Sequence, residues 1–192
     1  MFVSLPLPDR LRDPLQAFVE PRWEAGPEWS WTLPDQWHVT LAFLADVDPG
    51  TEEPLLEALA EVAARRDAFT FTLARAGTFP HPDAAKVLHL GPVEPVAELD
   101  RLAKAVRTAC QSVGARHDGR PFTAHLTLAR ARRPVSATRW LRVFDAWRSE
   151  PWQVTGFDLV SSQWAGPGSR SVHRVVERFA FLPSSGSPSS RH

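Results

Sequence analysis

Cysteine, lysine and tyrosine are scarce in this chain of 192 residues. The single cysteine, Cys110, excludes an internal disulfide and a zinc ribbon built on paired CxxC motifs, which favours a reducing compartment. Tyrosine is absent, and Lys86 and Lys104 are the only lysines among 22 basic residues. Cys110 lies on the apolar stripe of a predicted helix, so we expect it to pack in the core rather than to react.

Long apolar runs and a net charge are also missing. No stretch approaches the roughly 18 residues of a membrane span, and the first ten residues lack the basic region and apolar core of a secretory signal. We therefore expect a cytoplasmic protein that does not bind membranes. The 22 basic and 22 acidic side chains cancel, which argues against a histone-like protein.

The charges are unevenly distributed along the chain. Residues 1–100 carry 7 basic and 17 acidic side chains, whereas residues 101–192 carry 15 and 5. A basic half is a weak indication of a polyanionic partner. The alternative is that the two halves neutralise each other where they are in contact.

Hydrophobic periodicity predicts alternating strands and helices. Asp9 is expected to cap a helix with an apolar stripe ending at Val19, and Thr51 to cap another. The further helices are predicted over 51–66, 94–113 and 136–149. The strands are predicted over 2–7, over 29–33 and 37–44 as a pair joined by Pro34-Asp35-Gln36, and over 69–75, 86–90, 122–130, 154–163 and 172–181.

This order indicates an α+β fold with mostly antiparallel sheets, in which one strand–helix–strand theme is used twice. No linker divides the chain, so we expect one domain over 1–182. A loop rich in glycine, serine and arginine is expected over 165–171. The low-complexity segment 183–192 is expected to be a disordered tail.

A short internal repeat carries the candidate chemistry. Residues 38–42 read HVTLA and residues 125–129 read HLTLA, an offset close to half the chain. In a strand, His38 and Thr40 share one face, as do His125 and Thr127, with each histidine about 6–7 Å from its threonine. Their aliphatic neighbours face the other way, toward helices. We therefore expect the two polar pairs to meet in a cleft between two similar lobes.

Two histidines and two threonines around one phosphate form a coherent catalytic set. In-line attack at phosphorus needs a base on one side and an acid on the other, and imidazole transfers protons near neutral pH. The threonine hydroxyls can donate hydrogen bonds to the phosphate oxygens. One alternative is an ordinary pair of half-buried polar residues in each strand. Another is a zinc site using His38, His125 and a third histidine, although no HExxH motif is present.

Three longer blocks of sequence carry a resemblance to a known family. They read WHVTLAFLADV, AGTFPHPDAAKVLHLG and PFTAHLTLARARRP, in that order, and the likeness extends from the N-terminus to about residue 181. The chain resembles the 2H phosphoesterase superfamily. Within that superfamily it is most similar to the bacterial and archaeal RNA 2′,3′-cyclic phosphodiesterases, the LigT-like proteins also called 2′-5′ RNA ligases.

The resemblance implies a bilobal α+β fold with a central cleft, and hydrolysis of RNA 2′,3′-cyclic phosphodiesters to 2′-phosphomonoesters without metal or cofactor. It makes His38 the general acid and His125 the general base, with Thr40 and Thr127 holding the phosphate; the sequence alone does not distinguish the two histidines. The expected partner is RNA with a 2′,3′-cyclic phosphate end or a related cyclic nucleotide. A monomer without an obligate protein partner is expected.

Three other functions remain open for the same residues. The site could join tRNA halves through a 2′-5′ linkage, which is the reverse chemistry. It could act on another small cyclic nucleotide or on a 2′-5′ oligonucleotide. A non-catalytic module that binds RNA ends could also retain both histidines.

Substrate-binding candidates flank the two repeats. Arg130 follows the second repeat and is a candidate phosphate contact, although a regular strand would point it away from the His125 face. Phe43 and Phe122 could stack on bases, as could Trp31 and Trp164. Four arginines could form a basic rim for an RNA backbone: Arg132, Arg133, Arg170 and Arg174.

The remaining histidines carry less information. Relatives often have a tyrosine in the closing segment, and His173 is expected to occupy a similar place in this chain. The histidines at 81, 89 and 117 have no motif around them and are expected to be structural or exposed.

Overall fold

Eight strands of the described residues form one antiparallel sheet. The computed structural model describes residues 1–45, 47–163, 166 and 171–181. The strand order is β10-β9-β1-β3-β7-β6-β5, with β2 also paired to β7, and β4 and β8 form a separate two-stranded sheet. The strands are β1 Phe2–Pro6, β2 Ser30–Trp31, β3 His38–Phe43, β4 Phe69–Phe71, β5 Leu73–Phe79, β6 Ala85–Pro92, β7 Leu126–Val135, β8 Trp152–Val154, β9 Gly156–Gln163 and β10 Val172–Ala180.

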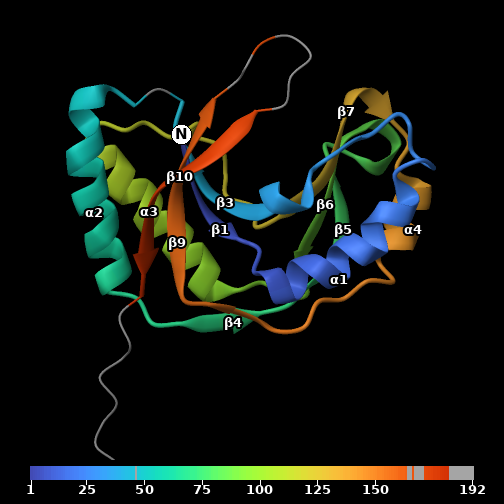
Figure 1. Cartoon of the computed structure of the whole chain (residues 1–192), viewed down its shortest axis with the longest axis horizontal. Helices are drawn as coiled ribbons and strands as arrows, with labels where there is room; N and C mark the ends of the chain where they lie inside the picture. The colour runs from blue at the N-terminus through green and yellow to red at the C-terminus, as the bar shows by residue number, and fades with distance from the viewer. Residues whose placement is uncertain (46, 164–165, 167–170, 182–192) are drawn as a thin grey trace, which may run out of the picture.

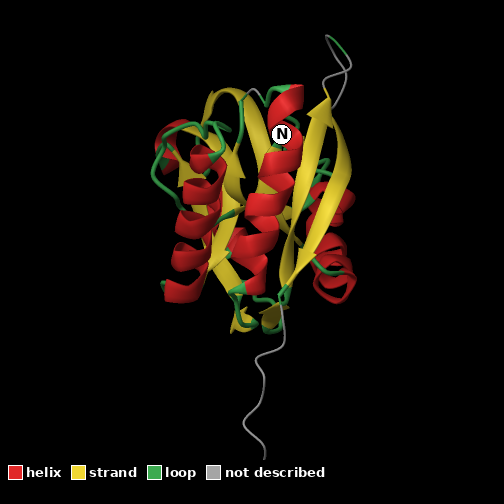
Figure 2. Ribbon diagram, turned by 90° about the vertical axis from the view of Figure 1, so that its left-hand side faces the viewer, coloured by secondary structure: helices red, strands yellow, loops and turns green. Residues whose placement is uncertain are grey.

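The sheet is covered by two pairs of helices, one pair for each half (Figure 1). Helices α2 and α3 pack against each other and against β3 and β10, and Figure 2 shows them lying in front of the strands. Helix α4 packs on β5, and α1 joins it through the Phe18 and Phe144 rings, whose centroids are 5.7 Å apart. The helices are α1 Asp9–Val19, α2 Glu52–Ala64, α3 Ala97–Ser112 and α4 Thr138–Phe144.

The two halves meet at the centre of the sheet, between β3 and β7. These strands pair only where Val39 lies opposite Leu126. Farther along β7, the short strand β2 takes the same edge, with Ser30 opposite Arg130. The strands that carry the two repeats therefore separate after a single pair of residues. This arrangement confirms the predicted α+β fold with two similar halves.

The predicted apolar stripe of α3 is buried. Leu99, Leu102, Val106 and Cys110 are inaccessible to solvent. Burial raises the pKa of the Cys110 thiol to about 12. Cys110 is therefore a core residue that stays protonated at neutral pH, as its position in the stripe predicted.

The predicted hairpin between 29–33 and 37–44 is wrong. Both edges of β3 are already occupied, one by β1 and the other by β7, so β2 pairs with β7 instead. The connecting residues Pro34–Gln36 form a turn of 3-10 helix rather than a tight hairpin turn. A proline at the first position of such a turn fixes its backbone angle and redirects the chain.

Other boundaries also differ from the sequence predictions. The strand expected over 69–75 divides at Thr72 into β4 and β5, which belong to different sheets. The strand expected over 122–130 begins only at Leu126, and the helix expected over 136–149 spans Thr138–Phe144. Such shifts arise because tertiary pairing, which local periodicity does not encode, decides where a strand starts.

Of the two predicted helix caps, one is confirmed in position only and the other is wrong. Thr51 occupies the N-cap of α2, but its side chain makes no capping hydrogen bond; Asp48 accepts one from the Gly50 N–H in the turn that precedes the helix. Pro8, not Asp9, occupies the N-cap of α1, and its carbonyl accepts from the Leu11 N–H. Asp9 lies in the first helical turn, where a carboxylate favours the positive end of the helix dipole.

Several predicted segments lie outside the described residues. These include the tail over 183–192, most of the loop over 165–171, and the side chains of Trp164 and Arg170. Among the described residues, none of the helices combines the length and the apolar character that crossing a bilayer requires.

Candidate active site

Both repeats contribute to one cleft of about 440 Å³ at the centre of the sheet. His38 and Thr40 on β3 line it, and so do His125, which immediately precedes β7, and Thr127 on β7. The predicted meeting of the two polar pairs is therefore observed. The cleft, which we call the histidine cleft, is also lined by Phe2, Ser30, Trp31, Thr32, Gln36, Phe43, Arg130, Ser162, Ser171 and His173.

The two histidine rings are held in the same way. Nδ1 of His38 lies 2.7 Å from the carbonyl oxygen of Gln36, and Nδ1 of His125 lies 2.7 Å from that of Thr123. A carbonyl oxygen only accepts hydrogen bonds, so each Nδ1 must carry the proton. In both rings Nε2 is therefore left to accept or donate a proton, as acid–base chemistry requires.

Burial and positive charge disfavour the protonated form of both rings in the free protein, because both lower the pKa values. Burial lowers the pKa of His38 to about 4. The hydrogen bond to the Gln36 carbonyl opposes this shift, and the charges of His173, Arg130 and His125 add to it. Burial also lowers the pKa of His125; the hydrogen bond to Thr123 opposes this shift and the charge of Arg130 adds to it. A bound anion would act in the opposite direction and favour the protonated rings.

A bulge in β3 brings Phe43 into the histidine cleft. Thr40 lies opposite Ser4 and Ala42 lies opposite Val3, so Leu41 is an extra residue in β3. One extra residue reverses the alternation of side chains. Leu41 and Ala42 are consequently both buried, and Phe43 faces the cleft, with half of its surface exposed (50%).

An equivalent bulge in β7 brings Arg130 to the same place in the second repeat. Thr127 lies opposite His89 and Ala129 opposite Leu88, so Leu128 is the extra residue. Leu128 and Ala129 are both buried, and Arg130 then lines the cleft. The expectation that a regular strand would turn Arg130 away is thus corrected, because the strand is not regular.

Two rings pack against His38, one stacked on it and one edge-on. The Phe2 ring stacks on His38 with centroids 4.8 Å apart. The His173 ring meets His38 edge-on at 5.9 Å and also contacts Phe2 at 5.0 Å. His173 therefore lies at the cleft. Burial lowers the pKa of His173, and nearby Asp35 raises it.

His89 supports His125, and sequence reasoning missed it. Its ring stacks on Phe79 with centroids 4.5 Å apart and meets His125 edge-on at 5.3 Å. Burial lowers the pKa of His89 to about 4. Gly77, opposite His89 on β5, leaves no room for a side chain there. The signal was a histidine between two core leucines, but its partner strand could not be read from the sequence.

Other predicted residues lie away from the histidine cleft. Phe122 does not line it and instead packs under the Arg107 guanidinium, 5.5 Å from the ring centroid. Arg132 and Arg133 line a neighbouring groove, and Arg174 is exposed on β10. Trp31 lines the cleft but is largely buried against Trp140 and Phe144. Within the described ranges, no group of three or more histidine, cysteine, aspartate and glutamate side chains is assembled that could hold a metal ion.

Comparison with known proteins identifies the family. Residues 10–164 match the model of the 2′-5′ RNA ligase superfamily. An RNA 2′,3′-cyclic phosphodiesterase of Geobacillus stearothermophilus is 38% identical over 129 residues, which are 67% of this chain but only 41% of that longer protein. The RNA 2′,3′-cyclic phosphodiesterase of Thermus thermophilus is 32% identical over 190 residues, covering 94% of this chain and 89% of that one.

Solved structures show the same fold. A crystal structure of a Thermus thermophilus protein matches with a TM-score of 0.77 at 26% identity, covering 95% of this chain and 98% of its own. Escherichia coli LigT in its apo form matches with a TM-score of 0.73 at 26% identity, covering 94% and 95%. The chain therefore belongs to the 2′-5′ RNA ligase superfamily. The predicted resemblance to the LigT-like 2H phosphoesterases is confirmed.

Proposed function

We propose that the protein hydrolyses 2′,3′-cyclic phosphodiesters at RNA ends to 2′-phosphomonoesters, with His38 and His125 as its acid–base pair. The observation that carries the proposal is the shared cleft in which two histidines, each anchored through Nδ1, present Nε2. The names of the relatives support the substrate class, since those of Geobacillus and Thermus are RNA 2′,3′-cyclic phosphodiesterases.

The reaction needs one proton removed and one supplied. Nε2 of His125 takes a proton from water as the water oxygen attacks phosphorus. The bond between phosphorus and O3′ breaks, and Nε2 of protonated His38 gives its proton to O3′. The products are a free 3′-hydroxyl and a 2′-phosphate. The family resemblance assigns these two roles, since the cleft itself is nearly symmetric.

Charge on the phosphate is balanced by residues of the same cleft. Thr40 and Thr127 present hydroxyls that make no hydrogen bond elsewhere among the described residues, so they are available to the non-bridging oxygens. Arg130 adds a guanidinium at the cleft wall. These donors act as the transition state forms and give the reaction a route that requires no metal ion. The pair of histidines then needs only to exchange protons with water and O3′.

The first test is hydrolysis of an oligoribonucleotide that ends in a 2′,3′-cyclic phosphate, measured in EDTA. We expect turnover and a product that carries only a 2′-phosphate, identified by chromatography against both phosphate isomers. A 3′-phosphate product would contradict the assigned bond cleavage, and loss of activity in EDTA would contradict metal-independent chemistry. Adding an RNA with a 5′-hydroxyl tests the reverse reaction, because ligation would give a joined 2′-5′ product.

The pH profile of kcat/KM should be bell-shaped, with its maximum below the ordinary histidine pKa of about 6.5. The reactive free enzyme holds one proton on the pair, so the rate falls above the higher pKa and below the lower one. Burial lowers the pKa of His38 to about 4 and also lowers that of His125. The alkaline decline therefore begins at a lower pH than for two free imidazoles. A maximum above 7 would contradict this assignment.

Replacing Arg130 should move that profile. The positive charge of Arg130 lowers the pKa of both His38 and His125, so Arg130→Gln raises both and shifts the maximum to higher pH. The value of kcat/KM also falls, but the position of the maximum is the informative quantity. Arg101→Gln, in an exposed turn of α3, is the matched control and should leave the profile in place. An unmoved profile in Arg130→Gln would show that this charge does not act on the pair.

A further inference from the structure

A second groove continues from the histidine cleft along β7. It measures about 810 Å³ and shares Ser30, Trp31 and Arg130 with the cleft. Arg132 and Arg133 on β7 also line it, and so does the half-buried Trp23. We call this the arginine groove. Because the two cavities share walls, a chain whose end lies at the histidines can continue into it.

The charge of the arginine groove is unbalanced. The side chains of Arg132 and Arg133 form no ion pair or hydrogen bond among the described residues, and both residues are exposed. The one acidic residue of the lining, Glu28, accepts a hydrogen bond from the indole of Trp140 at 3.3 Å. Arginines without carboxylate partners along a groove are suited to phosphodiester groups, which they contact irrespective of base sequence.

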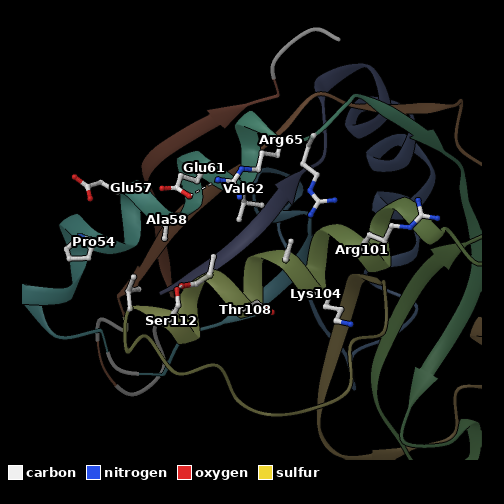
Figure 3. A pocket seen from close by; sticks show the side chains of 14 residues that line it. Pro54, Glu57, Ala58, Glu61, Val62, Arg65, Arg101, Lys104, Thr108 and Ser112 are labelled. Atoms are coloured by element: carbon white, nitrogen blue, oxygen red, sulfur yellow. Dashed lines mark hydrogen bonds and ion pairs between the residues drawn. The ribbon is translucent and has the colours of Figure 1, made fainter. Parts of the chain in front are cut away.

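A comparable groove elsewhere provides the contrast (Figure 3). It lies between α2 and α3, measures about 820 Å³ and carries Arg65, Arg66, Arg101 and Lys104. Its charge is partly neutralised, since Arg65 pairs with Glu61 at 3.2 Å and Arg101 with Glu98 at 3.4 Å. It shares no lining residue with the histidine cleft. A strand bound there would not continue into the catalytic residues.

We propose that the arginine groove binds the nucleotides that precede the cyclic end, so that the protein selects oligoribonucleotides over cyclic mononucleotides. This inference rests on the proposed function, because it supposes that the cyclic phosphate occupies the histidine cleft. Arg132 and Arg133 contact phosphates of the strand, and the ring of Trp23, which lines the groove, offers a surface on which a base can stack. Selection is therefore by length and charge rather than by sequence.

The test compares two substrates in one enzyme: a 2′,3′-cyclic mononucleotide and a short oligoribonucleotide ending in the same cyclic nucleotide. Wild type should show a higher kcat/KM for the oligomer. In the double variant Arg132→Glu/Arg133→Glu, the oligomer should lose about tenfold or more, while the mononucleotide rate stays unchanged. The salt dependence of the oligomer reaction should also weaken, by about 0.7 in the log–log slope for each phosphate that an arginine no longer neutralises.

The matched control is Arg101→Glu/Lys104→Glu in the α2–α3 groove, which should leave both substrates unaffected. Equal losses for both substrates in the Arg132/Arg133 variant, no oligomer preference in wild type, or a selective loss in the control would overturn the inference. If wild type turns over neither substrate, the proposed function fails. Binding of a labelled oligomer with a 2′-phosphate end then tests whether the arginine groove binds the strand. Weaker binding in the Arg132/Arg133 variant supports the inference, and equal binding overturns it.

Discussion

His125→Ala and His38→Ala should each lower kcat for a 2′,3′-cyclic RNA end by two to four orders of magnitude, a range of about 10² to 10⁴ that general acid–base groups typically contribute. Both rings line one cleft and both present Nε2, so each supplies a proton transfer that water performs poorly. The double variant should be little slower than the single ones, because residues that act in one step are not additive.

The controls separate chemistry from folding. His125→Asn and His38→Asn keep a side-chain N–H that can donate to the same carbonyl oxygens, but they lack Nε2 and should be as inactive as the alanine variants. His81→Ala removes an exposed histidine that does not line the cleft and should be fully active. Circular dichroism and thermal unfolding should match wild type in the asparagine variants. A His125→Ala enzyme with normal kcat would eliminate the proposed mechanism.

The second large effect is expected at the threonines. Thr40→Val and Thr127→Val keep the branched shape that suits a strand but remove the hydroxyl. Removing one hydrogen-bond donor to a developing negative charge typically lowers kcat by about 10² to 10³, and we expect a fall of that size for each variant. KM should change less, because the hydrogen bonds strengthen as charge develops on the phosphate. Kinetics of each variant with the cyclic mononucleotide and with the oligoribonucleotide would measure these changes in kcat and KM.

Conservative replacements make that prediction specific. Thr40→Ser and Thr127→Ser restore a hydroxyl and should recover most of the rate. Thr70→Val, on the exposed face of β4 and away from the cleft, should have no effect. If Thr40→Val retains normal kcat, the hydroxyl does not stabilise the transition state, and its part in the cleft is limited to packing.

The site's central residues were predictable because the chain repeats them. Two HxT segments half a chain apart, each with strand alternation, predicted that His38 and His125 would meet, and the structure brings both to one cleft. The orientation of Arg130 was harder to predict, because regular alternation along the strand points its side chain away from the His125 face. Its true direction depends on the extra residue Leu128, and a bulge depends on the pairing of a strand with its neighbour, which one sequence does not contain.

Contacts across the sheet decide which other rings reach the two histidines. His89 reaches His125 only because β6 pairs with β7. His173 reaches His38 through the order of the strands, in which β10 pairs with β9, β9 with β1 and β1 with β3. The hairpin error has the same cause: Trp29–Leu33 has strand character, but the sequence does not show that β3 already has two partners. Phe122 was placed by nearness to His125 in sequence, and Arg107 holds it elsewhere.

The hydrogen bonds from Nδ1 to the Gln36 and Thr123 carbonyls have a consequence for how the site can evolve. Many catalytic histidines are oriented by an acidic side chain, which must itself be retained. Here the orienting group belongs to the main chain, two residues before each histidine, so any residue type at 36 and 123 can provide it. Gln36 and Thr123 differ in chemistry yet hold their rings identically. The main chain therefore sets the geometry of the acid–base pair, and only the histidine and the threonine of each repeat are needed as a recognisable sequence signature.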